Sequence, residues 1–82
     1  MSKTVEIYST PTCHFCQAAK AYFAENNIEY TNYDVATDME KRKEMIEISS
    51  QMGVPVIVVN DGQTKEVLVG FDESKIRGLL GL

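Results

Sequence analysis

Four stretches of the chain have the residue pattern of β-strands, at positions 5–9, 28–35, 54–59 and 65–69. The first is rich in β-branched and aromatic residues, and the second alternates in character from one residue to the next, as a strand at the edge of a sheet does. The third is the most apolar run in the sequence and predicts a central strand. Pro55 then stands at the start of this strand, because proline has no N–H to give to an interior ladder.

Three further stretches predict helices, the first over about residues 13–26, the second over 39–48 and the third near the C-terminal end. Asparagine tolerates the left-handed backbone that ends a helix, so Asn26-Asn27 is expected to stop the first. Thr37-Asp38 offers side-chain oxygens that cap the second helix, and Asp72 or Ser74 offers the same for the third.

The order of these elements predicts an α/β fold in one domain of residues 1–82. A strand–helix–strand crossover is almost always right-handed and places its two strands parallel. Asn60-Asp61-Gly62 is a strong signal for a tight turn, so the last two strands are expected to form an antiparallel hairpin. The result is a four-stranded mixed sheet flanked by three helices, in the order β-α-β-α-β-β-α.

Size and charge narrow the function classes. A domain of 82 residues has room for a single modest core. Twelve acidic against eight basic residues give a net charge of −4, which argues against general nucleic-acid binding. The first residues lack the apolar centre of a signal peptide, and no apolar run approaches the ~18 residues of a membrane span. We therefore expect a cytoplasmic protein that binds neither membranes nor nucleic acids.

The chain has two cysteines, three positions apart in Cys13-His14-Phe15-Cys16, between the first strand and the first helix. In this context a Cys-x-x-Cys pair is typical of a redox-active dithiol. A helix N-terminus carries unpaired N–H groups and partial positive charge, so it is expected to stabilise a thiolate at Cys13. Cys16 lies about one turn inside the helix and is expected to be sheltered. Cys13 is therefore the predicted nucleophile and Cys16 the predicted resolving thiol.

The residues around the two sulfurs have a functional and a structural interpretation. An imidazolium at His14 would stabilise the Cys13 thiolate and make the disulfide more oxidising, or His14 is only a solvent-facing residue at a helix start. Phe15 lines a partner groove or belongs to the core, and the groove is favoured beside a redox pair. Tyr8 is assigned to the core or the groove wall. A zinc site needs four ligands and only His14 could join the cysteines, so no metal is expected. Two inert core thiols are the remaining alternative.

The element order and the cysteine pair together resemble the glutaredoxin branch of the thioredoxin fold almost end to end. The matching residues are 8–16 with Ala19-Lys20-Ala21, then Gly53-Val54-Pro55, then Gly70-Phe71-Asp72. The resemblance implies a cis peptide bond before Pro55, which faces the cysteine pair. It also implies that Val54 offers its backbone to a bound thiol peptide, and that Gly70, Phe71 and Asp72 close the far side of the groove. The small bacterial glutaredoxin-like proteins, including the redoxins that serve ribonucleotide reductase, are the most similar members.

Three departures from the family weaken a glutathione site. The family usually has proline and then tyrosine or a similar residue between the cysteines, where this chain has His14-Phe15. Many members have a lysine before the motif that pairs with a glutathione carboxylate, whereas this chain has Ser9-Thr10-Pro11. The Gly-Gly-x-Asp-Asp element that holds the γ-glutamyl end becomes residues 69–73, with one glycine lost and a glutamate as the last acid. We therefore expect weak dependence on glutathione and reduction by a protein, such as a thioredoxin-reductase-like flavoenzyme.

The sequence thus predicts a monomeric thiol–disulfide oxidoreductase that reduces protein or mixed disulfides through a Cys13/Cys16 dithiol cycle, without a bound organic cofactor or metal. Glutathione is the alternative reductant. Two alternatives from other classes stay open. One is a glutaredoxin that holds a [2Fe–2S] cluster between two chains with glutathione as co-ligand, against which Cys16 and the weak glutathione clamp argue. The other is a non-catalytic docking module, against which the intact cysteine pair argues.

Overall fold

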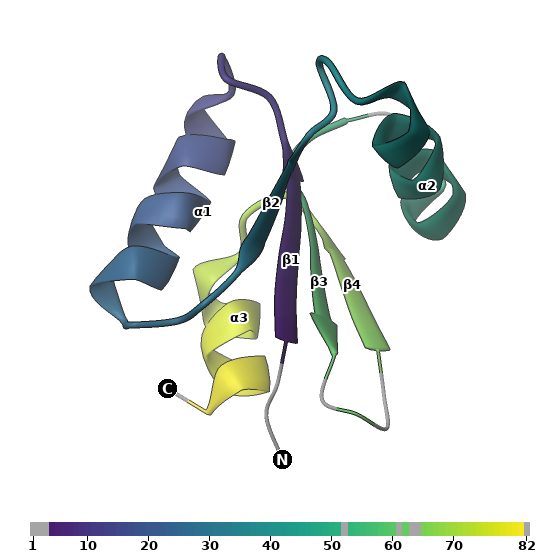
Figure 1. Ribbon diagram of the computed structural model, residues 1–82. Coiled ribbons are helices and arrows are strands. Elements are labelled where there is room, and N and C mark those ends of the chain that lie inside the picture. Colours follow the sequence, from purple (N-terminus) through teal and green to yellow (C-terminus); the bar gives the residue numbers. More distant parts are fainter. Residues whose placement is uncertain (1–3, 52, 61, 63–64, 82) are drawn as a thin grey trace.

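The computed structural model describes residues 4–51, 53–60, 62 and 65–81. Its elements are β1 (Thr4–Ser9), α1 (His14–Glu25), β2 (Thr31–Asp34), α2 (Met39–Ser49), β3 (Val56–Asn60), β4 (Lys65–Val69) and α3 (Glu73–Leu80). This order confirms the predicted β-α-β-α-β-β-α arrangement, and the strands form one mixed sheet in the spatial order β2-β1-β3-β4 (Figure 1). As predicted, β1 pairs parallel with β2, and β3 pairs antiparallel with β4. Among the described residues, no helix has the length and apolar character needed to cross a bilayer.

Two strands begin later than the sequence pattern predicts. The alternation predicts a strand over residues 28–35, but β2 spans Thr31–Asp34, so the prediction is wrong for residues 28–30 and for Val35. Ile28 and Tyr30 pack against the apolar core instead, so their spacing reflects core contacts and not a ladder. The apolar run predicts a strand from residue 54, but β3 begins directly after Pro55, which has no N–H for the ladder.

Each helix begins at a side-chain cap. Asp38 accepts a hydrogen bond from the backbone N–H three residues ahead at 3.1 Å, and Asp72 does the same at 3.3 Å. These two aspartates are therefore the caps of α2 and α3. Cys13 is the N-cap of α1, and Asn27 follows the end of that helix in the left-handed conformation, with φ of 55°.

The sheet separates two apolar clusters. The cluster between the sheet, α1 and α3 consists of Val5, Ile7, Ala19, Phe23, Ile57, Val59, Leu68 and Ile76. The cluster between the sheet and α2 consists of Tyr8, Val35, Met45, Val56 and Val58. Figure 1 shows the same division, with α1 and α3 on one side of the strands and α2 on the other. Both middle strands, β1 and β3, thus have buried residues on both faces, as their nearly continuous apolar character requires.

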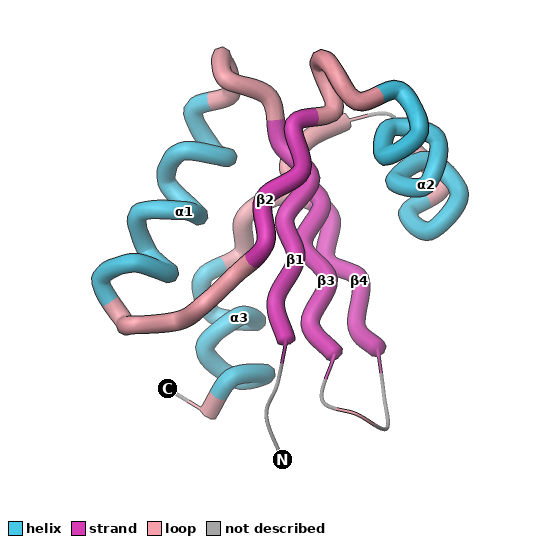
Figure 2. Tube along the Cα trace, viewed as in Figure 1, coloured by secondary structure: helices cyan, strands magenta, loops and turns pink. Residues whose placement is uncertain are grey.

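The topology brings two loops together at one end of the sheet. β1 and β3 run antiparallel with Tyr8 opposite Val56, so the segment after β1 lies beside the segment before β3. Figure 2 shows both loops in the upper part of the view. The first loop carries Cys13, and the second carries Val54 and Pro55.

Candidate active site

Cys13 holds its sulfur against the start of α1. Its backbone is extended, with φ −88° and ψ 117°, and its N–H donates to the carbonyl oxygen of Thr10 at 3.3 Å. The Sγ atom accepts a hydrogen bond from the backbone N–H of Cys16 at 3.2 Å. The sulfur therefore satisfies one of the N–H groups that the start of a helix leaves unpaired, which is the position predicted for Cys13.

Cys16 is the sheltered member of the pair. Its side chain is 0% exposed, whereas Cys13 has intermediate exposure, and both are free cysteines. Burial raises the pKa of the Cys16 thiol to about 12, and its hydrogen bond to Cys13 acts in the same direction. The structure thus combines one accessible sulfur with one buried thiol in the same helical turn.

The loop before β3 contacts the Cys13 sulfur. The peptide bond between Val54 and Pro55 is cis, as the family resemblance implies. The Cys13 thiol donates to the Val54 carbonyl oxygen over a long contact of 3.9 Å. Pro55 is buried and Val54 is half-buried, so the Val54 carbonyl is the polar group that this loop presents to the sulfur.

Gly70 ties the end of β4 to the same loop. Its N–H donates to the Pro55 carbonyl oxygen at 2.8 Å, and its φ of +84° lies in the region that favours glycine. The next two residues, Phe71 and Asp72, make structural contacts. The ring of Phe71 packs against Tyr22 with 5.8 Å between centroids, and the Asp72 carboxylate caps α3. Of the three residues predicted to close the groove, Gly70 is the one that the described contacts join to the site.

His14 and Phe15 are exposed between the two cysteines. The Phe15 side chain is 66% exposed, so it does not belong to the core. A large apolar side chain that is exposed to solvent is typical of a surface that meets a partner. His14 is the first residue of α1 and its side chain is exposed, the position that both of its interpretations predict.

Three segments of the site contain no Lys, Arg, Asp or Glu, although the chain has 8 basic and 12 acidic residues. They are the segment that carries Cys13, the segment whose Val54 contacts its sulfur, and the end of β4, which Gly70 joins to Pro55. We call residues 10–19, 53–60 and 67–71 the neutral zone. Two large apolar side chains of the neutral zone are exposed to solvent. Phe15 is 66% exposed, and Val69, directly before Gly70, is 46% exposed. The sequence analysis missed this feature because the segments are distant in the chain, although each segment's lack of charge was visible.

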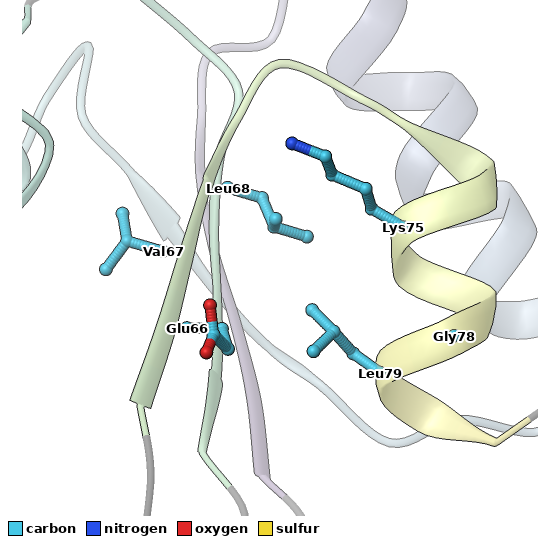
Figure 3. Close-up of a pocket in the computed structure, with 6 residues that line it drawn as sticks. All are labelled: Glu66, Val67, Leu68, Lys75, Gly78 and Leu79. Carbon is cyan, nitrogen blue, oxygen red and sulfur yellow. The ribbon is translucent and has the colours of Figure 1, made fainter.

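Other parts of the described structure were weaker candidates for a reactive centre. Within the described residues, no group of three or more His, Cys, Asp or Glu side chains is arranged to hold a metal ion. A pocket of about 360 Å³ lies between β4 and α3, lined by Glu66, Val67, Leu68, Lys75, Gly78 and Leu79. Figure 3 shows Leu68 from the strand and Leu79 from the helix on opposite sides of it. It contains neither cysteine, so the candidate active site is the surface around Cys13.

Comparison with known proteins places the chain among small redox proteins. Residues 5–63 match the protein-family model described as Glutaredoxin. An uncharacterized glutaredoxin-like 8.6 kDa protein from the rubredoxin operon of Clostridium pasteurianum is 43% identical over 76 residues, which cover 93% of this chain and 96% of that protein.

Solved structures give the same result for the fold. The thioredoxin-like protein BC3987 is similar with a TM-score of 0.80 and 30% identity, covering 93% of this chain and 99% of that one. The glutaredoxin-like NrdH-redoxin of Escherichia coli has a TM-score of 0.76 and 21% identity, covering 93% of each chain. The second likeness concerns the fold alone, and together they confirm the predicted thioredoxin-like architecture.

Proposed function

The chain belongs to the glutaredoxin family, and on that premise we propose that it is a thiol–disulfide oxidoreductase that reduces disulfides in proteins. One observation carries the proposal. The accessible Cys13 sulfur stands at the start of a helix, with the buried Cys16 thiol in the same turn. A nucleophile and a resolving thiol need this asymmetry, because the first must reach the substrate and the second must stay out of its reach.

In the first half of the cycle, Cys13 attacks as a thiolate. Its sulfur forms an S–S bond with one sulfur of the substrate disulfide, while the S–S bond of the substrate breaks. The departing substrate sulfur leaves as a thiolate and takes a proton from water. The N–H of Cys16, which points at Cys13 Sγ, orients the attacking sulfur.

The substrate backbone binds beside the attacking sulfur. We propose that Val54 hydrogen-bonds the substrate chain next to its disulfide, as a short added strand would. The 3.9 Å contact between Cys13 Sγ and the Val54 carbonyl oxygen supports this assignment, because a backbone bound at Val54 lies within reach of the sulfur.

Cys16 completes the reduction. It releases its proton to solvent and attacks Cys13 Sγ, so the Cys13–Cys16 disulfide forms and the second substrate sulfur leaves as a thiolate. The cysteine pair has then lost two electrons to the substrate. Burial is the largest cause of the raised pKa of Cys16 and persists, but the hydrogen bond and charge interaction with Cys13 end once Cys13 is in the mixed disulfide. Cys16 therefore becomes a better nucleophile only after the intermediate has formed.

The neutral zone favours proteins as partners on both sides of the cycle. Glutathione carries carboxylates and an ammonium group, and each charge-assisted contact that recognises them contributes about 1.5–3 kcal/mol. The neutral zone supplies no charged side chain for this purpose, and the Asp72 carboxylate is engaged as a helix cap. Lys20 directly follows the zone and its charge acts on the pKa of Cys16, but a single cation cannot pair with both carboxylates and the ammonium group of glutathione. A protein with apolar residues around its disulfide, or a protein reductant such as a thioredoxin-reductase-like flavoenzyme, matches the surface better.

A coupled assay tests the function and the reductant together. Insulin is the disulfide substrate, and NADPH loss is followed with glutathione and glutathione reductase in one cuvette and thioredoxin reductase in another. We expect turnover that requires this protein in the second cuvette and about tenfold less in the first, the effect of losing a single charged contact. Turnover with glutathione alone would contradict the proposed reductant. Failure to accelerate insulin reduction with dithiothreitol as well would contradict the oxidoreductase itself.

A further inference from the structure

Tyr8 lies between the two segments of the candidate active site, the one that carries Cys13 and the one that carries Val54 and Pro55. It is paired with Val56 in the antiparallel register of β1 and β3, and Pro55 directly precedes Val56. On its other side, the chain leaves β1 after Ser9 and reaches Cys13 four residues later. A side chain that binds Tyr8 is therefore linked to both strands next to the site, to β1 before Cys13 and to β3 after Pro55.

The Tyr8 hydroxyl links this position to α2. The residue is 1% exposed, and its hydroxyl donates to Glu44 Oε1 at 2.7 Å. Burial and the hydrogen bond to Glu44 both raise the pKa of Tyr8, and the same hydrogen bond lowers the pKa of Glu44. The phenol is thus a donor and the carboxylate a charged acceptor at neutral pH, which is the stronger class of hydrogen bond.

A small apolar contact holds α2 against the sheet. Met45 is the one buried residue of this helix, all of which the structure describes, and the half-buried Ile46 and Ile48 pack against the same apolar cluster. The ammonium of Lys41 also lies 4.2 Å from the centre of the Tyr33 ring. Because Lys41 is also paired with Glu44 at 3.3 Å, the position of the helix depends on the group that accepts from Tyr8.

The end of α2 controls the start of the loop that leads to Val54. The Ser49 hydroxyl donates to the carbonyl oxygen of Met45 at 2.6 Å and accepts from the N–H of Gln51 at 3.3 Å. Ser50 follows in the left-handed conformation, and its N–H donates to the carbonyl oxygen of Ile46 at 2.8 Å. These bonds fasten the beginning of the loop to the helix, and Val54 itself packs against the apolar cluster that contains Met45. A displacement of α2 therefore also changes the packing of Val54.

We propose that Tyr8 and Glu44 form a positioning pair, whose hydrogen bond sets the Val54 carbonyl relative to the Cys13 sulfur by holding α2 in place. The inference rests on the proposed function, because it concerns how a disulfide within a polypeptide is held at Val54. Neither residue of the pair touches the substrate. Their effect is therefore confined to disulfides that use Val54 and does not extend to the intrinsic reactivity of Cys13.

Two disulfide substrates distinguish an effect on binding at Val54 from an effect on the reactivity of Cys13. One is a peptide disulfide with several residues on each side of its cysteine, and the other is hydroxyethyl disulfide, which has no backbone to bind. Tyr8→Phe removes the hydroxyl but keeps the ring, whose centroid lies 5.1 Å from that of Tyr33. We expect the second-order rate constant of Cys13 with the peptide to fall about three- to tenfold, since small misplacements at a reacting centre cost up to ~10²-fold. The rate with hydroxyethyl disulfide should stay within about twofold of the wild-type value.

Two variants at the exposed end of the bond guard against a folding artefact. Glu44→Ala removes the acceptor from a side chain that is 47% exposed, and it should reproduce the loss seen in Tyr8→Phe. Glu44→Gln keeps an acceptor oxygen and should restore most of the peptide rate. A loss that Glu44→Gln fails to restore would contradict a role for the hydrogen bond.

Tyr33→Phe is the matched control. It removes another phenol–carboxylate hydrogen bond of 2.7 Å, from Tyr33 to Glu6, which joins β2 to β1, and it keeps the ring that Lys41 of α2 contacts. Both rates should be unchanged in this variant. A wild-type peptide rate in Tyr8→Phe, or an equal loss in Tyr33→Phe, would overturn the positioning pair alone. If the wild-type protein itself shows no preference for the peptide disulfide, substrate binding at Val54 fails, and the positioning pair fails with it.

Discussion

The Cys13 sulfur lies 3.9 Å from the Val54 carbonyl oxygen, although the two residues are 41 positions apart in the sequence. The pairing of β1 with β3 produces this approach, because it places the segment after Tyr8 beside the segment before Val56. A thiol that attacks a disulfide within a polypeptide benefits from a backbone partner next to it, and Val54 is in that position. The Cys13 sulfur and the Val54 carbonyl thus lie at the same end of one strand pair, the first after β1 and the second before β3.

Alkylation should distinguish the two thiols. The Cys16 thiol is buried and its pKa is raised to about 12. At pH 8 such a thiol is ionised to only about one part in 10⁴, and the thiolate is the reactive form. A short treatment with iodoacetamide at pH 8 should therefore modify Cys13 and leave Cys16 intact, as mass spectrometry of the digested protein would show. Labelling of both in urea is the control, and comparable labelling of both in the native protein would contradict the assignment.

Phe15→Ser should weaken the use of protein substrates without destabilising the fold. Because the side chain is 66% exposed, the free energy of unfolding should change by less than about 0.5 kcal/mol. The kcat/KM for a protein disulfide should fall about tenfold, since a large exposed aromatic residue near an interface centre is a typical energetic anchor. The rate with hydroxyethyl disulfide should not change.

Met39→Ser is the matched control for this substitution. Met39 is an apolar residue on α2 that is 52% exposed and lies outside the neutral zone. The Met39→Ser variant should change neither the kcat/KM for the protein disulfide nor the rate with hydroxyethyl disulfide. An equal loss of kcat/KM in both variants would show that exposed apolar surface acts generally, and that Phe15 has no special part in docking.

The hydrogen bond from Tyr33 to Glu6 should make stability depend on pH in the alkaline range. This bond, together with burial, raises the pKa of Tyr33 from 10.0 to about 12. Because the pKa is higher in the folded protein than in the unfolded chain, the contribution is fully present below pH 10 and is lost as the pH rises toward 12. Urea unfolding of wild-type protein and Tyr33→Phe measures it. The difference in unfolding free energy should be constant up to about pH 10 and shrink above it, and a difference that stays the same at high pH would refute the linkage.

Local patterns in the sequence were sufficient for most of the fold. Predictions that depend on a residue and its neighbours in the chain were correct. Examples are the aspartates that cap α2 and α3, and Asn27, whose left-handed backbone follows the end of α1. The two cysteines belong to the same class, because their spacing and the following helix lie within one short stretch. The cis bond before Pro55 followed from the family resemblance and from no property of the neighbouring residues.

Contacts between distant segments were beyond the sequence patterns. Ile28 and Tyr30 alternate like strand residues because they pack on the core, so the start of β2 was misplaced. The partner of the Tyr8 hydroxyl lies 36 positions away at Glu44, and no local signal names it. A tyrosine within an aliphatic strand indicates only that some partner is needed.

The central claim is that Cys13 attacks and Cys16 resolves, and trapping the intermediate tests it most directly. Reduced Cys16→Ser protein is mixed with an oxidised protein substrate, and the products are separated without reductant and mapped by mass spectrometry. Because the second step is missing, we predict a one-to-one covalent complex through Cys13 that dithiothreitol dissociates, and no such complex from Cys13→Ser. Full reduction of the substrate by Cys16→Ser at the wild-type rate, or an equal yield of complex through Cys16 in Cys13→Ser, would contradict the assignment of the two roles.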